Sequence, residues 1–130
     1  MALADIREAN ILVVDDEPIN LVLLEEMLSI EGFLHVEYVL SPFKALETLE
    51  ANEIDLILLD VKMPGMDGFE FIQSARQLKK DCPPILILTA SADAKTKQKA
   101  IEVEVQGLIS KPFDVEDILP AINDIFLSPL

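Results

Sequence analysis

Short apolar runs that each end on a polar residue constrain this chain more than any other feature of its sequence. They are residues 11–14 before Asp15 and Asp16, 56–59 before Asp60, 85–88 before Thr89, and 108–110 before Lys111. Runs of this length and composition are typical of strands that are buried on both faces of a parallel sheet. Ligands bind just outside the carboxyl ends of such strands. We therefore expect carboxylates, a hydroxyl and an ammonium group to meet at one edge of the sheet.

Segments with helical spacing lie between the apolar runs along the whole chain. This alternation predicts βαβ units with right-handed crossovers, and so an α/β fold around a parallel sheet. Further strands are expected over about residues 35–40 and 106–109. The length of 130 residues and a hydrophobic content of 51% suit one domain, which we place over residues 1–130 with a core of about 9–127.

Several helices carry start signals in the sequence. Pro18 is suited to the first turn of a helix, and Ser41-Pro42 provides an N-cap followed by an N1 proline. Asp114 is expected to open the last helix, in which Pro120 predicts a kink or a delayed start. The apolar faces expected from spacing are Leu21, Leu24 and Leu28 in the first helix, and Phe69, Ile72 and Leu78 in a helix over about residues 68–80.

Charge and cysteine content exclude several classes of function. A formal net charge of -14 argues against a nucleic-acid-binding surface and against adsorption to anionic membranes. Cys82 is the only cysteine, so no internal disulfide and no thiolate metal cluster is expected. The sequence has no secretory signal and no apolar run long enough to cross a bilayer. We therefore expect a cytoplasmic protein.

The predicted cluster of Asp15, Asp16 and Asp60 needs a compensating charge. At an effective dielectric of about 20, two carboxylates 4 Å apart repel by about 4 kcal/mol. A bound cation, a shared proton or a lysine relieves this repulsion. Oxygen ligands without His or Cys select a hard divalent ion, and a site with few ligands favours Mg²⁺ (or Mn²⁺) over Ca²⁺.

A phosphate group is the natural further ligand of such a metal. No glycine-rich loop follows the first strand, so a dinucleotide site or a P-loop is excluded. Asp60 is then the candidate nucleophile, because carboxylates accept phosphoryl groups as acyl phosphates. Thr89 is placed to donate a hydrogen bond to a phosphoryl oxygen, and Lys111 to neutralise another.

These residues match the motifs of a known family. The matching segments are residues 14–18 (Val-Asp-Asp-Glu-Pro), 59–68 (Leu-Asp-Val-Lys-Met-Pro-Gly-Met-Asp-Gly), 88–90 (Leu-Thr-Ala) and 111–113 (Lys-Pro-Phe). Over essentially its whole length, the chain resembles the receiver domain of two-component response regulators. The resemblance implies a flavodoxin-like, doubly wound five-stranded parallel sheet of order 2-1-3-4-5 with helices on both faces. It also implies a cis peptide bond between Lys111 and Pro112.

The resemblance also assigns a role to each residue of the cluster. It implies that Asp60 accepts a phosphoryl group from a phosphohistidine on a sensor histidine kinase or a histidine phosphotransfer protein. Asp16, Asp60 and the backbone carbonyl of Lys62 would bind Mg²⁺ directly, and Asp15 would act mainly through water. By the same resemblance, the phosphorylated state would be sensed by Thr89 and Lys111.

Three positions depart from the family pattern. The residue three before the lysine is commonly an aromatic that turns inward upon phosphorylation, and here it is Leu108. The output switch would then rest on Thr89 and on helix shifts. Glu104-Val105 replaces a small pair that usually precedes strand five, which puts the geometry of that turn in question. Lys62 occupies a position that tunes the access of water to the phosphate, and we hypothesise that it alters phosphate lifetime.

Other interpretations of the same residues stay open at this level. Asp15 or Asp16 could simply cap the first helix, and Lys95, Lys97 and Lys99 could form either a solvated face or a partner site. An aspartyl-nucleophile phosphohydrolase is the rival enzyme. It needs a second Asp two residues after the nucleophile, where this chain has Lys62. A degenerate receiver that only contacts proteins is a third alternative.

We expect a switching module that assists its own phosphorylation and is not a metabolic enzyme. Its expected partners are a histidine kinase or phosphotransfer protein, with no direct nucleic-acid or membrane contact. The sequence contains no recognisable output segment. The chain is therefore either a stand-alone regulator or one domain of a longer protein with a covalently linked output domain.

Overall fold

The computed structural model describes residues 5–90 and 92–127. In these ranges the strands form a five-stranded parallel sheet of order β2-β1-β3-β4-β5, as predicted. The strands are β1 (Ile11–Val14), β2 (Val36–Val39), β3 (Leu56–Leu59), β4 (Ile85–Thr89) and β5 (Gly107–Ser110). In the register of the sheet, Val14 pairs with Val39 on one side and with Leu59 on the other. The carboxyl ends of β1, β2 and β3 are therefore level with one another.

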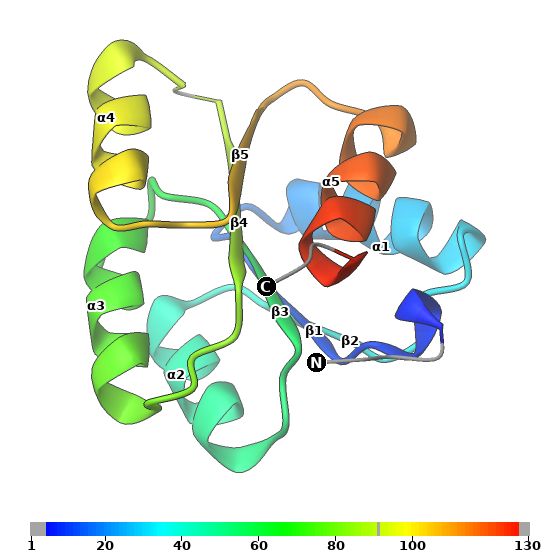
Figure 1. Cartoon of the computed structure of the whole chain (residues 1–130), viewed down its shortest axis with the longest axis horizontal. Coiled ribbons are helices and arrows are strands. Elements are labelled where there is room, and N and C mark those ends of the chain that lie inside the picture. The colour runs from blue at the N-terminus through cyan, green and yellow to red at the C-terminus, as the bar shows by residue number, and fades with distance from the viewer. Residues whose placement is uncertain (1–4, 91, 128–130) are drawn as a thin grey trace.

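Helices cover both faces of this sheet. They are α1 (Pro18–Ile30), α2 (Pro42–Ala51), α3 (Gly68–Leu78), α4 (Ala94–Glu102) and α5 (Val115–Leu127), with a short 3-10 helix, η1 (Ile6–Glu8), before β1. Figure 1 shows α1 and α5 on one side of the sheet and α2, α3 and α4 on the other. This is the doubly wound α/β arrangement expected from the alternation of strands and helices.

The core consists of two apolar layers separated by the sheet. Alternate residues of β1 point to opposite faces, so Leu12 and Val14 pack under α2 and α3, while Ile11 and Val13 pack under α1 and α5. Because every residue of β1, β3 and β4 is buried, these strands are continuous apolar runs in the sequence. That continuity is what made them recognisable.

The buried face predicted for α1 and the N-cap predicted for α2 are both confirmed. Leu21, Leu24 and Leu28 form the buried face of α1. The Ser41 hydroxyl accepts a hydrogen bond from the backbone N–H of Phe43, at 3.1 Å, and so caps α2. Each signal acts within a few residues of the chain, so neither depended on knowing the tertiary structure.

The apolar face predicted for α3 was partly wrong. The buried positions are Gly68, Phe71, Ile72 and Ala75, whereas Leu78 is 39% exposed and Phe69 is only half-buried. At about 100° per residue, Leu78 lies about 20° around the helix from the buried Phe71, so its exposure comes from its place as the last residue of the helix and not from the opposite face. Phe69 lies at the border of the buried face, where it packs against the core and also contacts the Lys99 side chain of α4.

Pro120 predicted either a kink in the last helix or a delayed start, and the structure of α5 decides one of these. The helix begins at Val115 with Pro120 inside it, so the delayed start is wrong and the kink remains a prediction. The carboxylate of Asp114 accepts a hydrogen bond from the Glu116 N–H at 2.9 Å, which stabilises the first turn. In the described ranges, no helix combines the length and apolar character that crossing a bilayer requires.

Candidate functional site

The backbone places the predicted site residues at one edge of the sheet. The N–H of Asp15 donates to the carbonyl of Val39 at 3.2 Å, and the N–H of Asp60 donates to the carbonyl of Val14 at 3.0 Å. The hydrogen bonding of the sheet therefore continues one residue beyond β1 and β3. Because these backbone positions are held by the sheet, the two carboxylates start from fixed and adjacent points.

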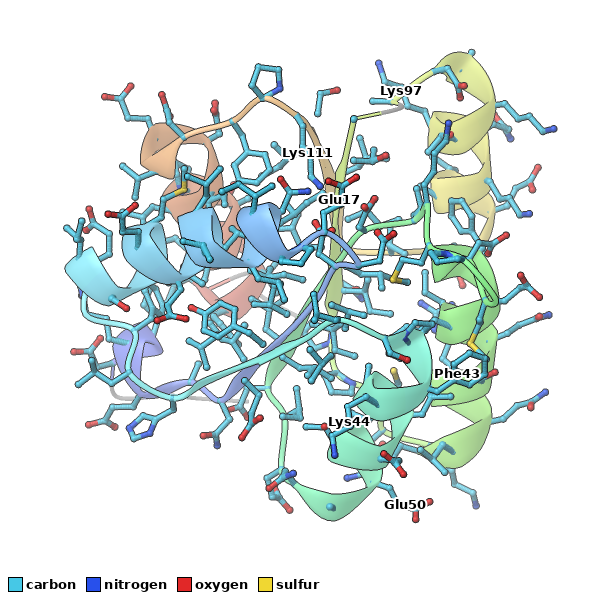
Figure 2. All side chains as sticks on the ribbon, turned by 180° about the vertical axis from the view of Figure 1, so that it is seen from behind. Glu17, Phe43, Lys44, Glu50, Lys97 and Lys111 are labelled. Atoms are coloured by element: carbon cyan, nitrogen blue, oxygen red, sulfur yellow. The ribbon has the colours of Figure 1, made fainter. Side chains whose placement is uncertain are left out.

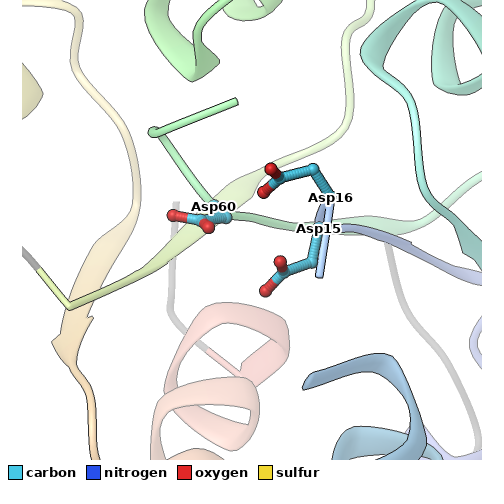
Figure 3. A group of neighbouring side chains, drawn as sticks. All are labelled: Asp15, Asp16 and Asp60. Carbon is cyan, nitrogen blue, oxygen red and sulfur yellow. The ribbon is translucent and has the colours of Figure 1, made fainter. Parts of the chain in front are cut away.

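Three carboxylates converge at this edge, as Figure 3 shows. One oxygen each of Asp15, Asp16 and Asp60 lies within 4.8 Å of the others. Asp15 and Asp60 are buried and Asp16 is half-buried. An all-oxygen donor set at this spacing fits a hard divalent cation such as Mg²⁺. The strand ends thus bring together the residues that the sequence singled out.

Lys111 supplies the positive charge of this cluster in the structure. It reaches from the end of β5 to the end of β1 (Figure 2), where its Nζ lies 2.9 Å from Asp15 Oδ2. The same Nζ lies 3.7 Å from Asp60 Oδ2. The Lys111 side chain is 15% exposed, so the ion pair with Asp15 is largely shielded from water. One ammonium group therefore faces a cluster of three carboxylates.

The surroundings of Asp60 disfavour the ionised form of its carboxyl group. Its pKa is raised, first because burial disfavours the charged form, and further because Asp15 and Asp16 repel a negative charge. Lys111 and the backbone N–H of Lys62 act in the opposite direction and only partly compensate. An ionised Asp60 thus lacks enough positive charge around it, which is the electrostatic condition for attracting a cation.

The backbone around the carboxylates orients them for binding. Asp60 Oδ1 accepts the N–H of Lys62 at 3.3 Å, and Asp15 Oδ1 accepts the N–H of Glu17 at 3.0 Å. The N-cap of α1 is Glu17, and its side chain makes no capping hydrogen bond. The simple interpretation of Asp15 or Asp16 as the N-cap of α1 is therefore wrong.

The loop between β3 and α3 is closed by a glycine and a capping box. A Cβ on Gly68 would lie 2.5 Å from Val61 Cα and 2.9 Å from the Asp60 carbonyl oxygen, so a larger residue cannot fit without moving the backbone after Asp60. The Asp67 carboxylate accepts the Glu70 N–H at 2.9 Å, and the Glu70 carboxylate accepts the Asp67 N–H at 3.1 Å. Sequence reasoning missed this box, although Asp67 and Glu70 have the required spacing of three.

Comparison with known proteins agrees with this geometry. The family described as "Response regulator receiver domain" matches residues 11–123. The chain belongs to the receiver domain family of two-component response regulators. It is thus a receiver module of the kind found in response regulators and hybrid kinases, and a phosphorelay role fits it.

Relatives of this receiver domain are themselves larger proteins. Sensor histidine kinase RcsC of Escherichia coli is 38% identical over 117 residues, which are 90% of this chain and 12% of that protein. Transcriptional activator protein IrlR of Burkholderia pseudomallei is 33% identical over 88% of this chain and 49% of its own length. The chain therefore spans half or less of the length of these relatives.

Solved structures share the fold of this receiver domain. Chemotaxis protein CheY4 of Vibrio cholerae superimposes with a TM-score of 0.82 at 32% identity, covering 91% of this chain and 98% of that chain. The signal receiver domain of an HD domain-containing protein from Pseudomonas fluorescens gives a TM-score of 0.83 at 28% identity. The CheY-like fold extends over nearly all of the chain.

The remaining predicted residues lie at the same edge or close to it. Thr89 ends β4 and is fully buried, and the backbone N–H of Lys111 donates to its carbonyl at 2.8 Å. The Lys111-Pro112 peptide bond is cis, as the resemblance implied. Leu108 is half-buried on β5 and packs against the core layer under α4. The Lys62 side chain is exposed on the loop after β3.

The turn between α4 and β5 in the receiver domain is held by Arg76, a residue of α3 that the sequence did not single out. Glu104 adopts a φ of 55°, in the left-handed region that favours glycine. The Arg76 guanidinium, from α3, donates to the carbonyls of Val103 and Glu104. Arg76 therefore bonds the two carbonyls that directly follow α4 and holds the turn that Glu104-Val105 had put in question.

Proposed function

We propose that Asp60 is the phosphoacceptor of this receiver domain. Its phosphoryl donor would be a phosphohistidine on a sensor histidine kinase or a histidine phosphotransfer protein. The observation that carries this proposal is the surrounding of Asp60, where two carboxylates lie within 4.8 Å and the Lys111 ammonium lies at 3.7 Å. This arrangement offers a nucleophile, donors for a metal ion and a cation for phosphate in one place.

The chain's own residues supply the geometry of the transfer. The Lys62 N–H holds Asp60 Oδ1, which leaves Oδ2, on the side of Lys111, as the attacking oxygen. A P–O bond forms between Oδ2 and phosphorus while the P–N bond to the imidazole breaks, and the departing nitrogen keeps the electron pair. The product is an acyl phosphate on Asp60. Lys111 then neutralises one phosphoryl oxygen, and the Thr89 hydroxyl donates a hydrogen bond to another.

Asp15, Asp16, Asp60 and the backbone carbonyl of Lys62 would hold Mg²⁺ (or Mn²⁺) in this domain. The fit rests on the donor set, which consists of hard oxygen atoms with three carboxylate oxygens within 4.8 Å of one another. When bound, the ion supplies positive charge that neutralises the carboxylates and the transferred phosphoryl group. Asp15, which already pairs with Lys111, would act mainly through water.

The signal would leave the site through Thr89, Lys111 and the face around Leu108. Phosphorylation adds about -1.5 to -2 charges at Asp60, and the two side chains would follow that charge. Leu108 lines a cavity of about 330 Å³ together with Ala100, Ile101 and Val105. Because Leu108 has no aromatic ring to rotate, the switch would consist of Thr89 movement and a shift of α4 rather than a ring flip.

The domain would act as a switch and not as an enzyme that turns over external substrates. We place it in the cytoplasm, where sensor kinases present their phosphohistidine. A covalently linked output domain is a further expectation, because the relatives it matches are kinases and regulators of greater length. The domain boundaries of 1–130, with a core of about 9–127, stay a prediction.

A single experiment separates this function from its rivals. The protein is incubated with Mg²⁺ and acetyl phosphate, and intact mass reports an added phosphoryl group. We expect one adduct on the wild type and on Asp55→Asn, a matched change at the opposite end of β3, and none on Asp60→Asn. An undiminished adduct on Asp60→Asn would refute the acceptor assignment. Absence of any adduct would favour a degenerate receiver, and rapid turnover of phosphoesters a phosphohydrolase.

A further inference from the structure

A groove of about 560 Å³ lies between the loop after β3 and helix α4, outside the carboxylate cluster. Apolar side chains of Met63, Pro64 and Phe69 line part of it. The basic residues that line it are Lys62, Lys95 and Lys99. In a chain with 10 basic and 24 acidic residues, this groove gathers three lysines around an apolar surface.

In the part of the chain that the structure describes, the three lysines form no close ion pair, although Asp93 interacts electrostatically with Lys62 and Lys95. No Asp or Glu oxygen in that part forms an ion pair within 4.0 Å of Lys62, Lys95 or Lys99. Two carboxylates belong to the surroundings of these lysines, because Asp67 lines the groove and Asp93 interacts with Lys62 and Lys95. Both also accept backbone hydrogen bonds, Asp67 at the start of α3 and Asp93 from the Thr96 N–H at 2.8 Å. The three lysines outnumber these two carboxylates, so the groove keeps an excess of positive charge that an anionic ligand can use.

The position of the lysines on α4 costs stability. Lys95 lies in the first turn of α4, where the helix dipole disfavours a cation. Lys95 and Lys99 are four residues apart on one side of the helix, where like charges repel. Lys99 is held over the Phe69 ring, with its Nζ 5.1 Å from the ring centroid. The contact with Phe69 stabilises Lys99, whereas the repulsion between Lys95 and Lys99 would be relieved by an anionic ligand.

We propose that this groove binds an acidic peptide segment of a partner protein that also carries apolar side chains. Carboxylates of the segment would pair with Lys62, Lys95 and Lys99, and an apolar side chain would pack on Pro64 and Phe69. A peptide suits the groove better than a nucleic acid, because the net charge of -14 repels a long polyanion. This surface adjoins the phosphoacceptor site through Lys62 and goes beyond the function proposed for that site.

Charge reversal in the groove, with a matched control on the same helix, tests this site. The probe is a fluorescein-labelled twelve-residue peptide in which Asp, Glu and Leu repeat, and binding to the full chain is read by anisotropy in low salt. The groove variant is Lys95→Glu/Lys99→Glu. The control is Lys97→Glu/Lys44→Glu, which changes the net charge equally. Lys97 lies on α4 but lines the cavity beside Leu108, and Lys44 lies on α2 (Figure 2).

We expect the groove variant to raise the dissociation constant of the probe about tenfold and the control to change it less than twofold. Circular dichroism establishes that both variants fold, and Lys95→Gln/Lys99→Gln provides a milder version of the same test. Three results would overturn the proposal. The first is that the groove variant and the control weaken binding of the probe equally. The second is that the probe does not bind the wild type in low salt. The third is that a labelled single-stranded DNA dodecamer binds more tightly than the peptide.

Discussion

Replacing Asp60 by Asn should make the metal-free receiver domain more stable at neutral pH. The change removes a buried negative charge that burial, Asp15 and Asp16 all disfavour. Asn keeps a carbonyl oxygen that can accept the Lys62 N–H, which now bonds Asp60 Oδ1 at 3.3 Å. The variant therefore loses the unfavourable charge while keeping the local hydrogen bond and nearly the same volume.

The distances in the cluster give the size of this effect. With an effective dielectric of about 20, each carboxylate within 4.8 Å of Asp60 repels it by at least about 3.5 kcal/mol. The Lys111 ammonium at 3.7 Å attracts it by about 4.5 kcal/mol. The repulsion from two carboxylates exceeds this attraction, and burial adds to the excess. We expect Asp60→Asn to raise the free energy of unfolding by about 2 kcal/mol.

Urea unfolding in EDTA at pH 7 measures this difference. With a denaturant slope near 2 kcal/mol/M, the midpoint of the variant should lie about 1 M above that of the wild type. Asp55→Asn is the matched control, because Asp55 is also buried and accepts the Asn10 N–H at 2.8 Å, far from the cluster. Its charge strengthens that hydrogen bond, so this variant should be equally or less stable than the wild type.

The pH dependence of the difference provides a second check. Because the pKa of Asp60 is raised in the folded state, the folded state holds its proton more tightly than the unfolded chain does. The wild type therefore loses stability as the pH rises from about 3.9, the ordinary pKa of Asp, through the raised pKa of Asp60. The advantage of Asp60→Asn should vanish below this window and be complete above it. A variant less stable than the wild type at pH 7 in EDTA would refute this electrostatic reasoning.

Other substitutions test the remaining parts of the site. Lys111→Met should lower the free energy of unfolding in EDTA by about 3 kcal/mol, because it leaves buried carboxylates without their cation. A urea midpoint at pH 7 that is the same as that of the wild type would contradict this. Gly68→Ala should cost about 2 kcal/mol, since the added Cβ meets Val61 Cα at 2.5 Å, and calorimetry that shows an unchanged thermal midpoint would disprove that clash. Lys62→Ala should alter the rate at which the phosphoryl group is lost from Asp60, and an unchanged rate in a time course of intact mass would remove Lys62 from that role.

Much of the fold and of the site could be predicted from the sequence, because the decisive signals are local. Strands buried on both faces of a parallel sheet are continuous apolar runs, and those of β1, β3 and β4 stand out without any tertiary information. Since parallel strands end at one edge, Asp15, Asp60, Thr89 and Lys111 were expected together there. The start of α2 at Ser41-Pro42 was equally local.

Tertiary structure decided the features that depend on contacts between distant segments. The sequence placed Phe69 and Leu78 in the buried face of α3, but packing leaves Phe69 at the border of that face and Leu78 exposed at the end of the helix. No spacing rule links Arg76 to the carbonyls after α4, which it contacts 27 and 28 residues further along the chain. Such contacts form only when separate helices are packed together.

In the carboxylate cluster, too, the sequence determines some features and the tertiary structure determines others. The order of residues along the chain determined which groups meet, because each one directly follows a strand. Only the packed structure set the spacing of the carboxylates, the pairing of Lys111 with Asp15 at 2.9 Å and the raised pKa of Asp60. Electrostatic energy depends on distance and burial, and both are properties of the folded chain rather than of the sequence of residue types.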